Sequence, residues 1–297
     1  MQSIRNAVGT VKDVILFFNA SAKRNFVMKQ FAGKQLQGLC ETRWIERHDS
    51  LLQFCTELRT IIRALKIISR WDDKDSSSKA NSLKAALCNC ELVVSLFSLC
   101  DILSLTLPVS KQLQGIQIDF QSARFMIADV ISVLKTRRTN FDHFDGIFAS
   151  ACERMKGLGV PVVQPRVSKC QANRANPAAT TPAEYYRRTI YLPLLDAVIT
   201  DMQSRFGEET MSALSELAYS IPAIIVKSVD IHTHIFDHLL KRYHNISFNG
   251  IEPAYQFKLQ GEIALWRQKW VTLQAERPED NIPQTVATGL AACDDCR

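Results

Sequence analysis

The stretch LCETRWIERHDSLLQFCTELRTIIRALKIISR, residues 39–70, shows most clearly how this chain folds. Apolar side chains recur in it at spacings of three, four and seven: Ile45, Leu52, Cys55, Leu58, Ile62, Leu65 and Ile68. Such spacing places them on one face of an α-helix, because a helical turn holds about 3.6 residues. The pattern predicts one long amphipathic helix over residues 42–70 and indicates a mostly α fold.

Trp44 stands at the start of this helix, between Arg43 and Arg47. One interpretation is that Trp44 is the first core residue of the helix, since apolar residues at helical spacing are usually buried. The other is that the two arginines form a cationic rim around a stacking ring, which is the chemistry that holds an unstacked base. The residue pattern alone leaves both interpretations open.

Helical patterns extend over most of the remaining chain. Residues 4–18 carry an apolar stripe, Ser21 can cap a following helix over AKRNFVMKQF, and KQLQGLC (34–40) is the best strand candidate. The Asp- and Ser-rich stretch WDDKDSSSKANS, which begins at Trp71, is typical of a linker. Further helices are predicted at about 82–107, 119–138, 141–157, 182–206, 208–219, 230–244 and 253–276.

The composition is that of an ordinary globular chain, with 46% hydrophobic and 22% charged residues in 297. The nine cysteines lack the even spacing of a disulfide framework, which predicts a reducing, intracellular location. The N-terminus carries Lys12 and Asp13 in its apolar stretch and has no small-residue cleavage site, so no signal peptide is predicted.

One segment, LVVSLFSLCDILSLTLPV (92–109), is apolar enough to resemble a membrane span. Asp101 lies at its centre and Pro108 near its end, and a central carboxylate is costly in lipid. A buried helix of a water-soluble protein is the preferred interpretation, and no membrane partner is expected.

Basic residues cluster in two blocks. Residues 1–70 hold twelve Lys and Arg against five Asp and Glu, and residues 135–188 hold ten against four. The second block includes a Pro- and Asn-rich loop, residues 157–182, which carries Arg166, Lys169 and Arg174 and no acid. Clustered cations are what a phosphate-facing surface needs, so DNA is the expected partner. The alternative is a basic surface that serves only to solvate the protein.

Three groups of residues could bind a metal, but none of them has the complete ligand set of a known metal site. His234 and His238 share a helical face, but the Glu of an HExxH motif is absent. The thiols of the CNC at 88–90 point apart, and the CxxC of Cys293 and Cys296 is half of a zinc site. No metal, cofactor or catalytic residue is predicted.

Several words of the sequence, in order, resemble the hAT transposase superfamily. They are IRNAVGTVKDVILFFNASAKRNFVMK, LCETRWIERHDSL, LQGIQIDFQSA, PRVSKCQANRANP, EYYRRTIYLPLLDAVITDMQSRF and EIALWRQKW. The chain looks most like the branch that includes the domesticated repressor of the inhibitor of the protein kinase and the zinc finger MYM-type proteins. The resemblance covers nearly the whole chain.

This resemblance implies a ribonuclease H-like core interrupted by a large all-helical insertion domain. Residues 1–41 would be a short remnant of that core, residues 42–276 the insertion domain, and residues 277–297 a tail leading towards a dimerisation region. In the family, the Trp that matches Trp44 acts near the flanking-end base during hairpin formation. The resemblance therefore favours the DNA-facing interpretation of Trp44.

The resemblance also predicts what these residues lack. The two Asp and one Glu that hold the metal ions in family enzymes would fall outside residues 1–297, as would the dimerisation signature, so self-association is expected to be weak. The expected function is that of a catalytically inactive, transposon-derived DNA-binding or regulatory protein. Its expected location is the nucleus. Its expected partners, besides DNA, include related full-length transposase-like proteins. A helical protein-interaction scaffold without nucleic-acid binding is the alternative. An active transposase would need the carboxylates from a longer isoform.

Overall fold

The computed structural model describes residues 2–39, 44–113, 120–165, 179–207, 221–227 and 254–276, with positions 210, 212, 216, 282, 283 and 288. These residues are mostly helical and none of them lies in a strand, which confirms the mostly α fold class. The ribonuclease H-like remnant stays a prediction, as do the three domain boundaries. The chain forms two compact units: residues 1–110 with 130–200, and residues 111–129 with 201–297.

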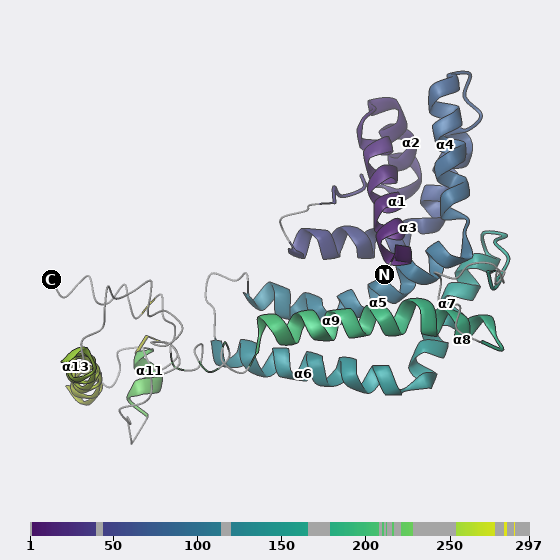
Figure 1. Ribbon diagram of the computed structural model, residues 1–297. Helices are drawn as coiled ribbons and strands as arrows, with labels where there is room; N and C mark the ends of the chain where they lie inside the picture. Colours follow the sequence, from purple (N-terminus) through teal and green to yellow (C-terminus); the bar gives the residue numbers. More distant parts are fainter. Residues whose placement is uncertain are drawn as a thin grey trace. The chain divides into compact units, whose positions relative to one another are not determined.

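The first unit begins with a group of packed helices (Figure 1): α1 (Gln2–Asn19), α2 (Ala22–Ala32), α3 (Trp44–Ile68) and α4 (Lys74–Leu87). Helix α1 contacts α2 and α4, and α3 contacts the same two helices. The side chains between them are fully buried, among them Val11, Phe18, Met28, Leu58 and Leu65. The Ser21 hydroxyl caps α2 by accepting the Arg24 amide at 3.5 Å. These helices confirm the predictions for residues 4–18, for the Ser21 cap and for the long helix after residue 42.

The strand predicted at 34–40 is wrong for its described part, because residues 35–39 form no regular secondary structure. Their backbone is bound by side chains instead. The Leu36 carbonyl accepts the Asn19 amide at 3.2 Å, and the Gly38 carbonyl accepts the Ser50 hydroxyl at 2.8 Å. Gln53 accepts the Gln37 N–H at 2.9 Å. Side chains of α1 and α3 thus satisfy a backbone that a ladder would otherwise satisfy.

The predicted linker after Trp71 is mostly helical, since α4 starts at Lys74. Asp73 caps it by accepting the Asp75 amide at 3.3 Å, and Ala80, Leu83 and Leu87 are buried on one face. The predicted helix 82–107 is therefore two helices, which are separated at Cys88 and Asn89. The Asn89 side chain accepts the Leu92 amide at 3.3 Å, as an N-cap residue does.

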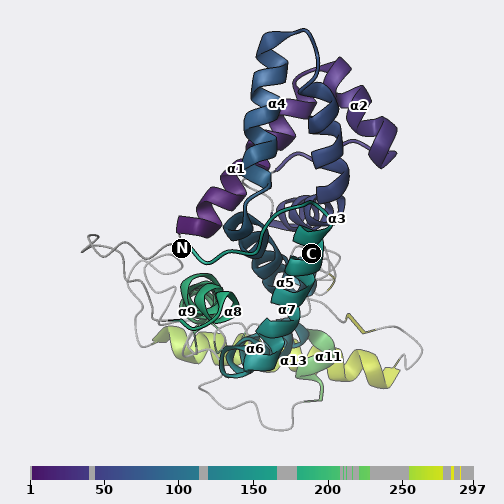
Figure 2. The same ribbon diagram turned by 90° about the vertical axis from the view of Figure 1, so that its right-hand side faces the viewer.

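The following elements are α5 (Cys90–Leu113), α6 (Phe120–Thr139), α7 (Phe141–Lys156), α8 (Pro182–Tyr186), the π-helical segment η1 (Arg187–Tyr191) and α9 (Leu192–Arg205). Most of them belong to the first unit, but the first half of α6 and the C-terminal ends of α5 and α9 belong to the second. Figures 1 and 2 show α5, α6 and α9 side by side. Asn140 caps α7 through the Asp142 and His143 amides, and Thr181 caps α8 through the Glu184 amide. The predictions at 119–138 and 141–157 are confirmed, and the one at 182–206 is confirmed with a π-helical turn inside it.

Helix α5 is long and apolar enough to cross a membrane, as its sequence suggested. Half of its most apolar window is buried within the protein, and nine of its residues between Cys90 and Val109 are buried. Asp101 in its middle is ion-paired with Arg137 at 2.7 Å. These contacts support the interpretation of α5 as a core helix.

The second unit contains the described helices α11 (Pro222–Ile225) and α13 (Ala254–Glu276), which contact each other. The Ala223 amide donates to the Pro283 carbonyl at 3.2 Å, and Ile221, Ala223, Ile224 and Ile282 form a small apolar cluster. Helix α13 confirms the prediction for 253–276. The helix predicted at 230–244, with its three histidines, and the pair Cys293 and Cys296 lie outside the described residues.

Candidate nucleic-acid interface

The side chains predicted to bind DNA are not described by the structure. Arg43, Arg166, Lys169 and Arg174 lie outside the described residues, and so do the side chains of Trp44 and Arg47. The backbone of Trp44 and Arg47 forms the first turn of α3. All six assignments therefore stay predictions. The described part of the same unit holds a different basic surface, on α2.

Helix α2 turns three long side chains to solvent: Lys23, Phe26 and Lys29 are all exposed. They are spaced three residues apart, which places them within about 120° of the helix circumference. Phe26 is the middle one, and 61% of it is exposed. The opposite face holds Val27 and Met28 in the core. We call Lys23, Phe26 and Lys29 the α2 face.

No carboxylate lies near the α2 face along the chain. Residues 14–40 contain Lys23, Arg24, Lys29 and Lys34 and no Asp or Glu. The nearest described ion pair in this segment is loose, with Lys34 Nζ 3.9 Å from Glu57 of α3. Lys23 Nζ also lies 4.4 Å from the centroid of the Trp71 ring, which steadies a cation without neutralising it. The Lys23 charge also helps to lower the pKa of Asp73, so one carboxylate, from the start of α4, lies near this end of the α2 face in space although none is near it in sequence.

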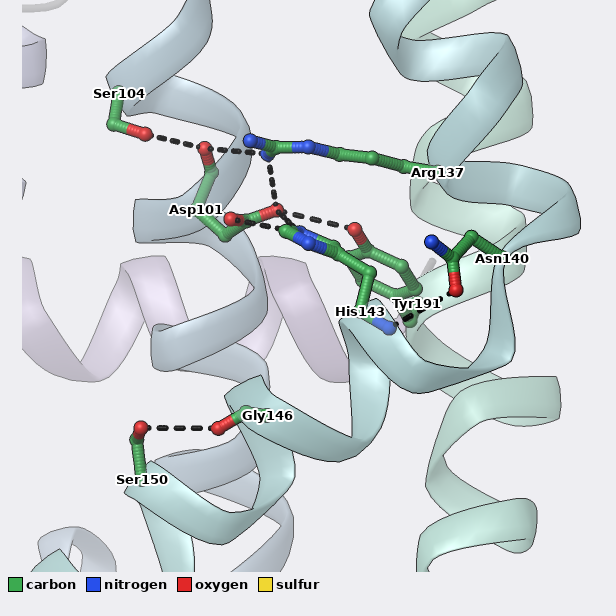
Figure 3. A network of polar contacts seen from close by, with 8 residues as sticks. All are labelled: Asp101, Ser104, Arg137, Asn140, His143, Gly146, Ser150 and Tyr191. Carbon is green, nitrogen blue, oxygen red and sulfur yellow. Dashed lines mark hydrogen bonds and ion pairs between the residues drawn. The ribbon is translucent and has the colours of Figure 1, made fainter.

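A second group of polar side chains lies in the interior of the same unit and centres on Asp101 (Figure 3). Arg137 Nη1 donates to Asp101 Oδ2 at 2.7 Å, and Tyr191 Oη donates to the same oxygen at 3.1 Å. His143 Nε2 lies 3.2 Å from Oδ1. The side chains of Asp101 and Arg137 are only 15% and 18% exposed. We call these four residues the Asp101 network.

The π-helical segment η1 brings Tyr191 to this network. A π-helical turn holds one more residue than an α-helical turn, so it changes the direction in which the following side chains point. Tyr191 and Tyr186, at its two ends, are both buried, and Tyr186 Oη donates to the Val163 carbonyl at 2.8 Å. Burial raises the pKa of both tyrosines well above the ordinary value, and for Tyr191 the Asp101 charge raises the pKa further. Both rings therefore act as neutral hydrogen-bond donors.

The Asp101 network joins helices and leaves little room for other chemistry. Its donors come from α6, α7 and η1 and occupy both oxygens of the one carboxylate on α5. Among the described residues, no three His, Cys, Asp or Glu side chains are grouped as metal ligands. The network fixes the helices on which the rest of the unit is assembled.

Sequence reasoning missed both groups, although each has a signal. The α2 face could have been found from the acid-free run 14–40, in which Phe26 interrupts a helical row of lysines. Asp101 was noticed only as an obstacle to a membrane span. An acid in the middle of an apolar helix also predicts a buried cation, and Arg137 follows it in the next helix.

Comparison with known proteins finds distant relatives over most of the chain. The sequence is 24% identical over 302 residues to the human 52 kDa repressor of the inhibitor of the protein kinase, covering 96% of this chain and 38% of the human protein. It is 23% identical over 303 residues to the mouse protein of the same name, with the same coverage. The chain thus spans less than two fifths of these relatives. No family model and no solved structure matches. Nearly the whole chain is therefore distantly similar to one stretch of a repressor.

Proposed function

We propose that the chain is a transposon-derived regulatory protein without catalytic activity, and that it binds nucleic acid through the α2 face and the start of α3. The α2 face carries this proposal, because it combines an exposed aromatic ring with two exposed lysines in a segment that has no acid. Distant similarity to a repressor over 96% of the chain agrees with a regulatory role. The ordered hAT-like words supply the transposon origin, and with it a nuclear location.

The α2 face has the chemistry of a site for single-stranded nucleic acid. Lys23 and Lys29 are separated by about 9 Å along the helix axis, which is the rise of two to three stacked nucleotides. Phe26 lies between them, where a base can stack while the lysines contact phosphates. Helix α2 packs against α3, which begins at Trp44. We propose that Arg43, Trp44 and Arg47 extend the same surface.

Substitution of Phe26 tests the proposal. A stacked base contributes about 1–3 kcal/mol, so Phe26→Ala should weaken binding to single-stranded DNA about 5- to 150-fold in fluorescence anisotropy. Its unfolding midpoint in urea should not change, because Phe26 is mostly exposed. The control is Phe125→Ala on α6, where a phenylalanine is 64% exposed outside the acid-free segment. Equal affinity of Phe26→Ala and the parent would overturn the proposal.

The alternative is a helical scaffold that binds proteins, and one observation favours it. Leu16 and Phe31, on α1 and α2, are 55% and 42% exposed, as in an apolar docking surface. The dependence of binding affinity on salt concentration distinguishes the two functions. Phosphate binding weakens steeply with ionic strength, with a slope of about 0.7 per cation for a single strand, whereas an apolar contact changes little. Lys29→Ala should lower that slope by about this amount if nucleic acid is bound.

A further inference from the structure

Two cysteines from different helices, Cys55 of α3 and Cys100 of α5, lie together in the first unit. Each thiol shifts the pKa of the other, so the two sulfur atoms are close enough to interact. Cys100 Sγ also donates to the Leu51 carbonyl at 3.8 Å. Leu51 precedes Cys55 by one helical turn, so the Cys100 sulfur lies against the turn of α3 that carries Cys55. Both residues are half-buried, and neither cysteine is in a disulfide.

The surroundings of the two thiols are unequal. The Cys100 S–H lowers the pKa of Cys55, and the nearby Arg154 guanidinium lowers it too, against the opposing effect of burial. Arg154 Nη1 lies 3.5 Å from the carbonyl of Thr56, the residue after Cys55. The pKa of Cys100 is raised by its hydrogen bond with Cys55 and by burial. Cys55 is therefore the thiol that ionises first, and Cys100 keeps its proton.

We propose that Cys55 and Cys100 form a dithiol that hydroperoxides oxidise to a disulfide between α3 and α5. The Cys55 thiolate attacks one oxygen of hydrogen peroxide, the O–O bond breaks, and hydroxide leaves, which gives a sulfenic acid at Cys55. The Cys100 sulfur then displaces the sulfenic oxygen, which leaves as water with the Cys100 proton. Two thiols are oxidised and one peroxide is reduced, and a small dithiol reverses the reaction.

The chain contains matched controls for the reactivity of this pair. Burial raises the pKa of Cys88 and of Cys152, and the pKa of neither is lowered overall as that of Cys55 is. A thiol reacts as the thiolate, so Cys55 should be alkylated faster by iodoacetamide at neutral pH than either control. Cys88 and Cys152 are partly exposed as well, so access alone does not favour Cys55.

The experiment treats the reduced full chain with hydrogen peroxide and maps its peptides by mass spectrometry. The expected product is one Cys55–Cys100 disulfide that dithiothreitol reverses. The Cys100→Ser variant should instead accumulate a sulfenic acid at Cys55 that dimedone traps. Arg154→Gln should slow the oxidation about threefold for each pH unit by which the pKa of Cys55 rises.

Circular dichroism of each variant serves as the control for folding. The disulfide mapping and its reversal by dithiothreitol use the wild-type chain, so they do not depend on any substitution. Oxidation of Cys88 or Cys152 before Cys55 would overturn the proposal. A disulfide from Cys55 to any cysteine other than Cys100, or the absence of any disulfide, would overturn it as well.

Discussion

At the scale of single residues, the structure separates two arginine–aspartate pairs that look alike in sequence. Arg137 and Arg138 are neighbours on α6, yet the first pairs with Asp101 in the interior and the second with Asp196 at the surface. The side chains of the inner pair are 15–18% exposed, whereas those of the outer pair are 48% exposed. Water screens the outer pair, so the two pairs should differ greatly in their effect on stability.

We expect Asp101→Ala to lower the free energy of unfolding by about 3–5 kcal/mol, because it leaves the Arg137 charge buried without its partner. Asp196→Ala is the matched control and should cost about 0–1 kcal/mol. Urea denaturation followed by circular dichroism measures both. Similar losses for the two variants would show that Asp101 does not hold the interior together.

Tyr191 should make stability depend on pH in alkaline solution. Its pKa is raised in the folded protein by burial and by Asp101, whereas an unfolded tyrosine titrates near pH 10. Its contribution is therefore complete below about pH 10 and is lost as the pH rises towards the folded pKa, because the unfolded chain releases its proton first.

Tyr191→Phe should remove the Tyr191 part of this dependence, up to about 1.4 kcal/mol per pH unit above pH 10, and leave the part that comes from Tyr186. It should also lower stability by about 1.5–3 kcal/mol at neutral pH, since a hydrogen bond to a charged group is lost. Urea unfolding of the variant and the parent between pH 8 and 11 provides the comparison. Parallel curves would mean that Tyr191 ionises equally easily in both states.

At the scale of elements, caps decide where helices begin, and α7 shows this best. The Asn140 side chain accepts the amide of His143 at 3.3 Å (Figure 3) and that of Asp142 at 3.0 Å. His143 is itself part of the Asp101 network. The cap thus holds the backbone from which that imidazole reaches the carboxylate.

Asn140→Ala should consequently cost about 0.5–2 kcal/mol of unfolding free energy, as the loss of an N-cap does. Asn140→Asp keeps an acceptor at the same place and should restore most of this loss. Thermal unfolding of the two variants gives the measurement. If both variants lost the same stability, the hydrogen bonds of Asn140 would not be the cause.

The helices were predictable wherever an apolar stripe runs on one face, as in α1 and α3. The linker prediction after Trp71 was wrong because it considered only the local preference of Ser and Asp for turns. The burial of Ala80, Leu83 and Leu87 favours a helix and outweighs that preference. The strand prediction at 34–40 was wrong because an alternating pattern of apolar residues indicates which side chains are buried. It does not show which groups hydrogen-bond to the backbone. The Asp101 network could not be predicted from the sequence, because Asp101 and Tyr191 are 90 residues apart and only the tertiary structure brings them together.

At the scale of the whole molecule, the distribution of charge agrees with the proposed binding of nucleic acid. The chain carries a net charge of +6, which is concentrated in residues 1–70 and 135–188. Both blocks contribute to the first compact unit. A polyanion attracted by this unit would meet cations from both basic blocks.

We expect the purified chain to bind transposon-end DNA without cutting or joining it in Mg²⁺ or Mn²⁺. The reaction needs carboxylates that hold two metal ions, and on the proposed hAT origin those carboxylates would fall outside residues 1–297. Gel analysis of labelled strands provides the measurement. Nicking that disappears when one of the chain's own acids is substituted would contradict this expectation.

Helix α5 has a consequence for how the protein is made on the ribosome. Its carboxylate is ion-paired with Arg137, 36 residues later, and accepts a hydrogen bond from Tyr191, 90 residues later. At about 5–20 residues per second, synthesis takes roughly 5–18 s to travel from Asp101 to Tyr191. Throughout that interval the nascent chain exposes an apolar helix that still lacks its contacts with α6, α7 and η1. Chaperones that recognise emerging apolar segments should therefore bind this chain at α5 and release it once Tyr191 has emerged.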